Sequence, residues 1–167
     1  MNTMSNQHDL GDIDVRVDED RFQGAYRQMA AGVNTMVFGH IAVKKKAMAC
    51  VAEFGRGNFD APLDKFPGKK AFINETIEQV RANLKALIAD ADMLAVAAVE
   101  GRLDTRADAS KHGGDFRKIV EGVNRTLDSV IGPLNVAAEY VDRISKGDIP
   151  PKITDKYNGD FNEIKNN

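Results

Sequence analysis

The side chains that most often carry chemistry are sparse in this sequence. Its three histidines, His8, His40 and His112, lie far apart, and none has a cysteine or a paired carboxylate at the spacing of a metal site. The one cysteine, Cys50, cannot form an internal disulfide and lies in an alanine-rich stretch, where plain packing is its usual role. No glycine-rich phosphate loop, nucleophile elbow or catalytic dyad is present. We therefore expect no enzyme activity, no cofactor and no metal.

One short run has the look of a catalytic signature. Residues 112–116 read His-Gly-Gly-Asp-Phe, which resembles the Gly-Gly-Asp-Glu-Phe signature of diguanylate cyclases. The glutamate is missing, no strand-like segments flank the run, and it falls on a repeat position that elsewhere reads Gly-Ala-Tyr or Gly-Asp-Phe. We interpret it as part of a repeat and not as a catalytic site.

Composition favours a helical protein that neither binds nucleic acid nor spans a membrane. The 167 residues carry a net charge of −2, and the densest basic run, 44–46, is too short for a phosphate-binding patch, so we interpret it as a solvated face. The longest apolar run, 93–99, is far shorter than the roughly 20 residues that cross a bilayer. The first ten residues are polar and lack a signal peptide, and a single cysteine fits a reducing compartment. We expect a cytoplasmic location.

The elements that would position any functional residue repeat along the chain. A similar sequence motif, called here a phrase, begins at each of four glycines, at positions 11, 57, 101 and 147. The glycines are spaced 46, 44 and 46 residues apart. A first apolar anchor follows each glycine by two residues, at Ile13, Phe59, Leu103 and Ile149. A second anchor follows by six residues, at Val17, Leu63, Ala107 and Ile153. A second glycine closes each phrase, and the tripeptide Gly-Val-Asn recurs at 32–34 and 122–124.

Between these phrases the apolar residues alternate steps of four and three, which is the heptad seam of a coiled coil. In the first series the seam comprises Ile73, Ile77, Val80, Leu84, Leu87, Ala91, Leu94 and Ala98. In the second it comprises Phe116, Val120, Val123, Leu127, Val130, Leu134, Ala137, Val141 and Ile144. Segment 26–54 keeps the rule less well, because a strict register places His40 and Lys44 in the seam, and we expect a phase break there.

The pattern predicts helices at about 25–55, 72–100 and 115–146, with another starting near 160. Each ends at a glycine, the favoured residue just past a helix C-terminus. Pro133 removes a backbone hydrogen bond from the last long helix, so we expect a kink or a restart there. A connector of about 13 residues with two spaced apolar anchors is best explained by a segment that runs back along a helical bundle.

The elements follow one another as a helix, a glycine, an extended connector with two apolar anchors and a second helix. This order resembles the HAMP domain. The stretch from Gly132-Pro133-Leu134 through Ile144 to Gly147-Asp148-Ile149 is similar to a HAMP first helix and the start of its connector. Residues 85–167 resemble the tandem HAMP region of methyl-accepting chemotaxis proteins, and residues 39–85 resemble poly-HAMP segments. The acidic pair often found at the start of the second HAMP helix is absent here.

The resemblance implies an all-α fold of stacked four-helix bundles, each built by a parallel homodimer. It divides the chain into residues 1–40 (a tail with a partial unit), 41–88 and 89–131 (complete units), and 132–167 (a partial unit). It further implies a sensor domain upstream and a methyl-accepting or kinase output domain downstream.

The resemblance also implies signal transduction by relay between two packings of the bundle. The residues expected to set the balance are Gly57, Phe59, Leu63, Gly101, Leu103, Gly147, Ile149 and Pro133. Small residues at Ala91, Ala98 and Ala137 underfill the seam at those layers. The alternatives are a HAMP array of a sensor histidine kinase, or a coiled-coil spacer that only sets distance and dimerises partners.

Overall fold

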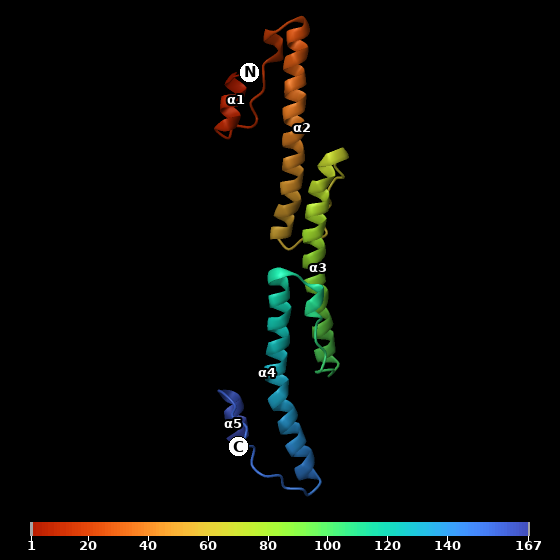
Figure 1. Ribbon diagram of the computed structural model, residues 1–167, viewed down its shortest axis with the longest axis vertical. Coiled ribbons are helices and arrows are strands. Elements are labelled where there is room, and N and C mark those ends of the chain that lie inside the picture. The colour runs from red at the N-terminus through yellow and green to blue at the C-terminus, as the bar shows by residue number, and fades with distance from the viewer. Residues whose placement is uncertain (1, 167) are drawn as a thin grey trace. The chain divides into compact units, whose positions relative to one another are not determined.

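The computed structural model describes residues 2–166, which fold into five α-helices without a β-strand (Figure 1). The helices are α1 (Asn2–Asp9), α2 (Gly24–Gly55), α3 (Ala71–Val99), α4 (Gly114–Ser145) and α5 (Asp160–Asn166). Three 3-10 turns precede α2, α3 and α4: η1 (Glu19–Arg21), η2 (Gly68–Lys70) and η3 (Ala109–Lys111). The all-α class predicted from the sequence is confirmed, and the three long helices agree with the expected ranges to within one residue.

Four segments join the helices and are called here the first to fourth connectors: residues 10–23, 56–70, 100–113 and 146–159. The connectors begin alike because α2, α3 and α4 end in the same way. After α2, the N–H of Gly57 donates to the carbonyl of Phe54 (2.9 Å) and the N–H of Asn58 to that of Glu53 (3.0 Å). Gly57 has a φ of 84°, which closes this Schellman motif at no steric penalty for glycine. The matching glycines Gly101 and Gly147 adopt φ of 76° and 81°.

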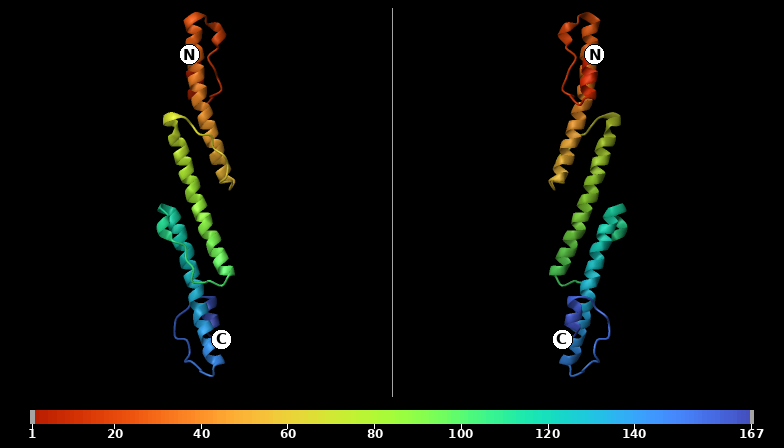
Figure 2. Two further views of the ribbon diagram at one scale, coloured as in Figure 1. Left: turned by 90° about the vertical axis from the view of Figure 1, so that its right-hand side faces the viewer. Right: turned by 90° about the vertical axis from the view of Figure 1, so that its left-hand side faces the viewer.

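The chain divides into two compact parts, Met1–Leu84 and Lys85–Asn167, and the division falls within α3. In the N-terminal part, the first half of α2 lies beside α1, and its second half lies beside the start of α3 (Figures 1 and 2). Neighbouring helices run in the same direction, because each connector returns the chain before the next helix starts. The C-terminal part repeats the arrangement with the end of α3, α4 and α5.

Two features differ from the sequence expectation. Helix α1 occupies the segment expected to be a tail, and it folds because Met4 is buried against Val17 and Ala30. Helix α4 continues through Pro133 without a restart, so that alternative was wrong. The helix axis does change direction in this region (Figure 1), the bend expected where proline removes one hydrogen bond.

Within residues 2–166, none of the helices combines the length and the apolar character that crossing a bilayer requires.

Candidate functional site

The second connector packs most closely against its helices. Its anchors Phe59 and Leu63 are partly buried against a cluster formed by Ala47, Cys50, Phe54, Ala61, Phe66 and Ile77. The rings of Phe54 and Phe59 lie 5.7 Å apart between centroids, at an interplanar angle of 56°. The deepest connector residues are Ala61 and Phe66, which the sequence analysis did not single out. Cys50 is buried in this cluster.

In the first and third connectors, the two anchors differ in burial. The second anchors Val17 and Ala107 are 7% and 5% exposed. The first anchors Ile13 and Leu103 remain 38% and 42% exposed, and Ile149 of the fourth connector is 85% exposed. In the first and third connectors, the second anchor is therefore the more deeply buried of the two.

Asparagine side chains hold the connector backbone in three places. Asn34 of α2 accepts from the N–H of Val17 (2.9 Å) and donates to the carbonyl of the same residue (2.8 Å). Asn124 of α4 makes the same pair of bonds with Ala107, at 3.1 and 2.8 Å. In each case, the residue held is the second anchor. These two asparagines were missed as functional residues, although the recurring Gly-Val-Asn was the signal that could have found them.

The second connector has a related clamp built from different positions. Asn74 of α3 accepts from the N–H of Phe66 (2.9 Å) and donates to the carbonyl of Asp64 (2.8 Å). Two turns further along α3, the Arg81 guanidinium donates to the carbonyls of Phe59 and, at 2.7 Å, of Ala61. The polar clamp of this connector thus spreads over most of its length.

Arg81 is a charged side chain of α3 that lies largely buried beside the second connector. Its side chain is 13% exposed, it pairs with Glu78, and its guanidinium lies 4.9 Å from the centre of the Phe54 ring. Burial alone would lower the pKa of Arg81, but the hydrogen bond and charge of Glu78 outweigh it and hold this pKa above its ordinary value. The sequence analysis did not single out Arg81, whose long side chain carries its charge inward to the connector carbonyls.

Within residues 2–166, His112 of the third connector is the only buried histidine. His112 is 9% exposed, and its Nε2 lies 2.6 Å from Oδ2 of Asp90 on α3. His8 instead contacts the carbonyl of Val15 at 2.8 Å, and His40 is exposed. Across residues 2–166, no group of three His, Cys, Asp or Glu side chains could hold a metal ion.

The lysine run forms ion pairs with two connectors. Lys45 Nζ lies 3.0 Å from Oδ1 of Asp14 in the first connector, and Lys46 pairs with Asp64 in the second. All four side chains are more than half exposed, so each pair contributes at most about 1 kcal/mol. The run is solvated, as expected, yet it also touches two successive connectors.

The predicted seam is only partly covered within one chain. Ile77 and Val120 are buried, whereas Val80, Val123, Val130 and Leu134 are 42–46% exposed and Val141 and Ile144 are more exposed still. His40 and Lys44 are exposed, so the seam of α2 is interrupted there, as the phase break predicted. Phe116, Leu127, Ile73, Leu84, Leu87 and Leu94 are partly buried.

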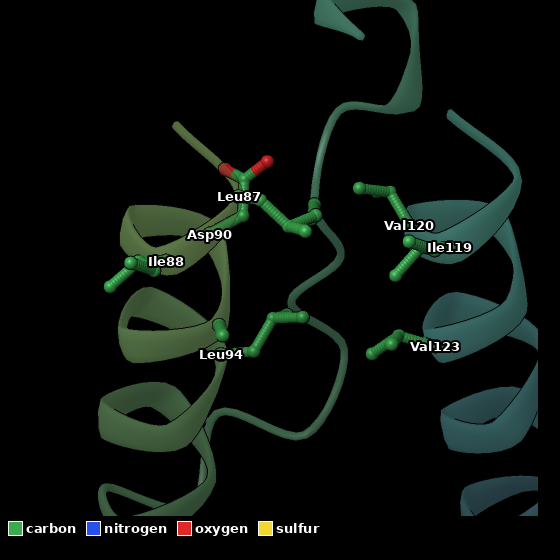
Figure 3. A pocket seen from close by; sticks show the side chains of 9 residues that line it. Leu87, Ile88, Asp90, Leu94, Ile119, Val120 and Val123 are labelled. Atoms are coloured by element: carbon green, nitrogen blue, oxygen red, sulfur yellow. The ribbon is translucent and has the colours of Figure 1, made fainter. Parts of the chain in front are cut away.

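In the C-terminal part, the open seam forms an apolar groove of about 300 Å³ (Figure 3). Leu87 and Leu94 of α3 point towards Val120 and Val123 of α4, while Ile88 points away. Ala107 of the third connector also lines the groove. A second groove, of about 380 Å³, lies between α4 and the fourth connector with α5, and Leu134, Val141 and Ile144 line it. Seam positions from parallel helices therefore converge on open apolar surfaces.

Parallel helices joined by returning connectors are the arrangement of a HAMP domain, and family models match the chain in two places. The HAMP domain model matches residues 111–167, and the model described as HAMP N-terminal domain 3 matches residues 43–85. These matches identify HAMP sequence in residues 43–85 and 111–167.

A curated relative adds the kind of protein to which this region is similar. The chain is 38% identical over 133 residues to methyl-accepting chemotaxis protein McpB of Pseudomonas aeruginosa. The aligned stretch covers 77% of this chain and 20% of the relative, so the chain spans about a fifth of the length of that protein. The findings thus support a HAMP region of a chemoreceptor.

Proposed function

We propose that this chain relays conformational change from a sensor to an output module in a chemoreceptor, and that it does so as a parallel homodimer. The observation that carries the proposal is the open apolar seam. Its residues lie at heptad spacing on parallel helices, and within residues 2–166 all of them except Ile77 and Val120 stay partly or largely exposed. A second copy in parallel register would cover each groove and complete a four-helix bundle in every repeat unit.

The relay requires a bundle with two packings separated by a few kcal/mol, so that a small input shifts their populations. The small seam residues Ala91, Ala98 and Ala137 leave room for a second packing. In this proposal, units 41–88 and 89–131 are complete, and the chain works on the cytoplasmic side between an upstream sensor and a downstream output. The connector residues Phe59, Leu63, Leu103 and Ile149 set the balance between the packings.

A coiled-coil spacer that only sets distance gains nothing from connectors clamped to the helices. The bidentate asparagine contacts to Val17 and Ala107 are specific backbone contacts that a spacer has no need for. They favour the relay over the spacer.

The dimer is tested by pulsed EPR on the chain with Cys50→Ala and one nitroxide at Arg125→Cys, an exposed position on α4. A parallel in-register dimer gives a single short intermolecular distance, on the order of the width of two to four packed helices, or about 10–30 Å. A long distance, or no intermolecular distance at concentrations well above those used for signalling assays, would exclude the parallel dimer.

The relay itself is tested in a receptor in which this chain replaces the aligned stretch of the Pseudomonas aeruginosa relative. Leu103→Asp places a charge at a connector anchor and is expected to bias the output towards one state. Lys111→Asp, on the exposed side of the same connector, is the control. Unchanged output with Leu103→Asp in a folded receptor would disprove the role of the anchors.

A further inference from the structure

We propose that each connector and the second helix of its unit form one rigid body, and that the motion of the relay occurs between this body and the first helix. The positioning residues are the clamping asparagines Asn34, Asn74 and Asn124. This inference rests on the proposed function, because it states which surfaces move during the relay.

The clamp fixes the connector in more than one direction. Asn34 is 3% exposed, and its amide bonds both the N–H and the carbonyl of Val17, as a neighbouring β-strand would. Its Nδ2 also donates to Oε1 of Glu19 at 2.7 Å. Two opposed bonds to one residue prevent sliding along the helix and rotation about the connector. Because the pair is buried, water cannot replace either bond when the other breaks.

The third and second connectors are held to their second helices in the same multi-point manner. Asn124 of α4 bonds both backbone groups of Ala107, and Arg106 of the connector pairs with Asp128 of α4 at 2.7 Å. On α3, Asn74 spans Asp64 and Phe66, and Arg81 adds bonds to two further carbonyls. The positions differ between the units, but the pairing of connector with second helix is common to all three.

The polar contacts from first helices to connectors differ in kind, because none of those shown bonds both the N–H and the carbonyl of one connector residue. The first connector has the contact of His8 with Val15. The second has the exposed ion pair of Lys46 with Asp64 and a 3.9 Å contact from Cys50 Sγ to the carbonyl of Ala61. The third has the pair of His112 with Asp90.

In the second unit, Asn58 also donates to Glu53 of α2 at 3.1 Å, and Phe59 packs on Phe54 of the same helix through an apolar contact. Apolar contacts are not directional, so they permit a helix to rotate or slide while its surface stays buried. The weaker boundary in each unit therefore lies along the first helix.

The test uses two intrachain distances in the third unit of the whole chain with Cys50→Ala. One nitroxide pair, Asp104→Cys with Arg125→Cys, joins connector and second helix. The other, Asp92→Cys with Asp104→Cys, joins first helix and connector. All three label sites are exposed. Excess unlabelled chain dilutes the spins, so the distances are intrachain whether or not the chain dimerises. A failed parallel dimer and a failed rigid body are thereby distinguished.

Motion is induced by Ala91→Leu, which enlarges an underfilled seam position on the first helix and replaces no residue of the clamp. We expect the first-helix distance to shift and the connector–second-helix distance to stay unchanged. A shift of the connector–second-helix distance, alone or together with the other, would overturn the proposal. So would a shift of neither distance.

The clamp is removed with Asn124→Leu, and Asn135→Leu on an exposed position of the same helix is the matched control. Asn124→Asp keeps the shape and the acceptor but loses the donor, and it serves if the leucine variant does not fold. We expect the Asn124 variants to broaden the connector–second-helix distribution while the control leaves it narrow.

Hydrogen exchange distinguishes a clamp from a general structural role. With Asn124→Leu, the Ala107 amide proton should exchange about tenfold faster, the effect of losing one hydrogen bond, while helical amides of α4 are unaffected. An unchanged distribution, or equal broadening of both distances with α4 amides equally deprotected, would show that Asn124 does not position the connector.

Discussion

The second and third connectors occupy equivalent places in their repeat units and are held by different chemistry. In the second connector, the Phe59 ring packs on Phe54 of α2. The Arg81 guanidinium of α3 donates to the connector carbonyls of Phe59 and Ala61. The third is held by a neutral amide at Ala107 and by His112 against Asp90, and its first anchor is half exposed. The two repeat units therefore share a geometric requirement, a connector held against its second helix, and not a set of residues.

Both solutions work because an extended connector leaves its N–H and carbonyl groups without partners in a ladder or helix. Each buried group of that kind must find a partner, because leaving it unpaired costs about 1–3 kcal/mol. An asparagine amide satisfies one of each, and an arginine satisfies carbonyls only. The two connectors should therefore respond differently when their clamps are removed.

The largest expected effect is the loss of Arg81. Arg81→Met keeps much of the apolar stem but leaves the carbonyls of Phe59 and Ala61 without their donor. We expect the free energy of unfolding to fall by about 2–4 kcal/mol, since bonds from charged donors contribute about 1.5–3 kcal/mol each. Urea denaturation at fixed chain concentration measures it. Arg125→Met, on an exposed face of α4, is the control, and an equal loss in both variants would refute the clamp.

A smaller effect is expected from the aromatic pair of the second connector. Phe59→Leu preserves an apolar anchor and removes the contact between the rings of Phe59 and Phe54. We expect a loss of about 1 kcal/mol, because such pairs contribute about 0.5–1.5 kcal/mol beyond area burial. Leu103→Phe is the reciprocal change in the third connector, where no partner ring is present, and it should yield no matching gain. A gain of equal size there would mean that the two connectors do not differ in the way described.

The helices and the connector periodicity could be predicted from the sequence because they depend on local signals. Seam spacing and the glycines at 57, 101 and 147 fix where helices end, and the structure agrees with these bounds. The depth of each anchor could not be predicted, because it depends on packing against distant residues. Ala61 is buried while Ile149 is exposed, which reverses the order that hydrophobicity alone suggests.

The polar clamps were harder still to predict. Asn34 and Asn124 contact residues 17 positions away, so only the recurrence of Gly-Val-Asn marked them. Arg81 follows the seam residue Val80 as Asn124 follows the seam residue Val123, so the same helix position carries a different residue type in the second unit and the recurrence is hidden. A buried charge bound to backbone carbonyls leaves no pattern in sequence, because its partners are common to every residue type.

The smallest expected effect is a loss of stability at low pH in one of the two 3-10 turns, η2 and η3, that end the second and third connectors. Asp108 caps η3 of the third connector by accepting from Ser110, and these hydrogen bonds hold the pKa of Asp108 below its ordinary value. A carboxyl with a lowered folded-state pKa stabilises the fold above its unfolded pKa, and this contribution disappears as pH falls through the folded pKa. Pro67 occupies the equivalent place before η2 and makes no side-chain cap, so the second connector lacks this dependence.

Below pH 4, amide exchange at Ser110 and Lys111 should therefore accelerate relative to the intrinsic acid rate, while that at Lys69 and Lys70 should not. Asp108→Asn should abolish the difference between the two turns. If both turns loosen together in the unmodified chain, the acid sensitivity belongs to the whole unit, and the distinction between the connectors does not extend to their caps.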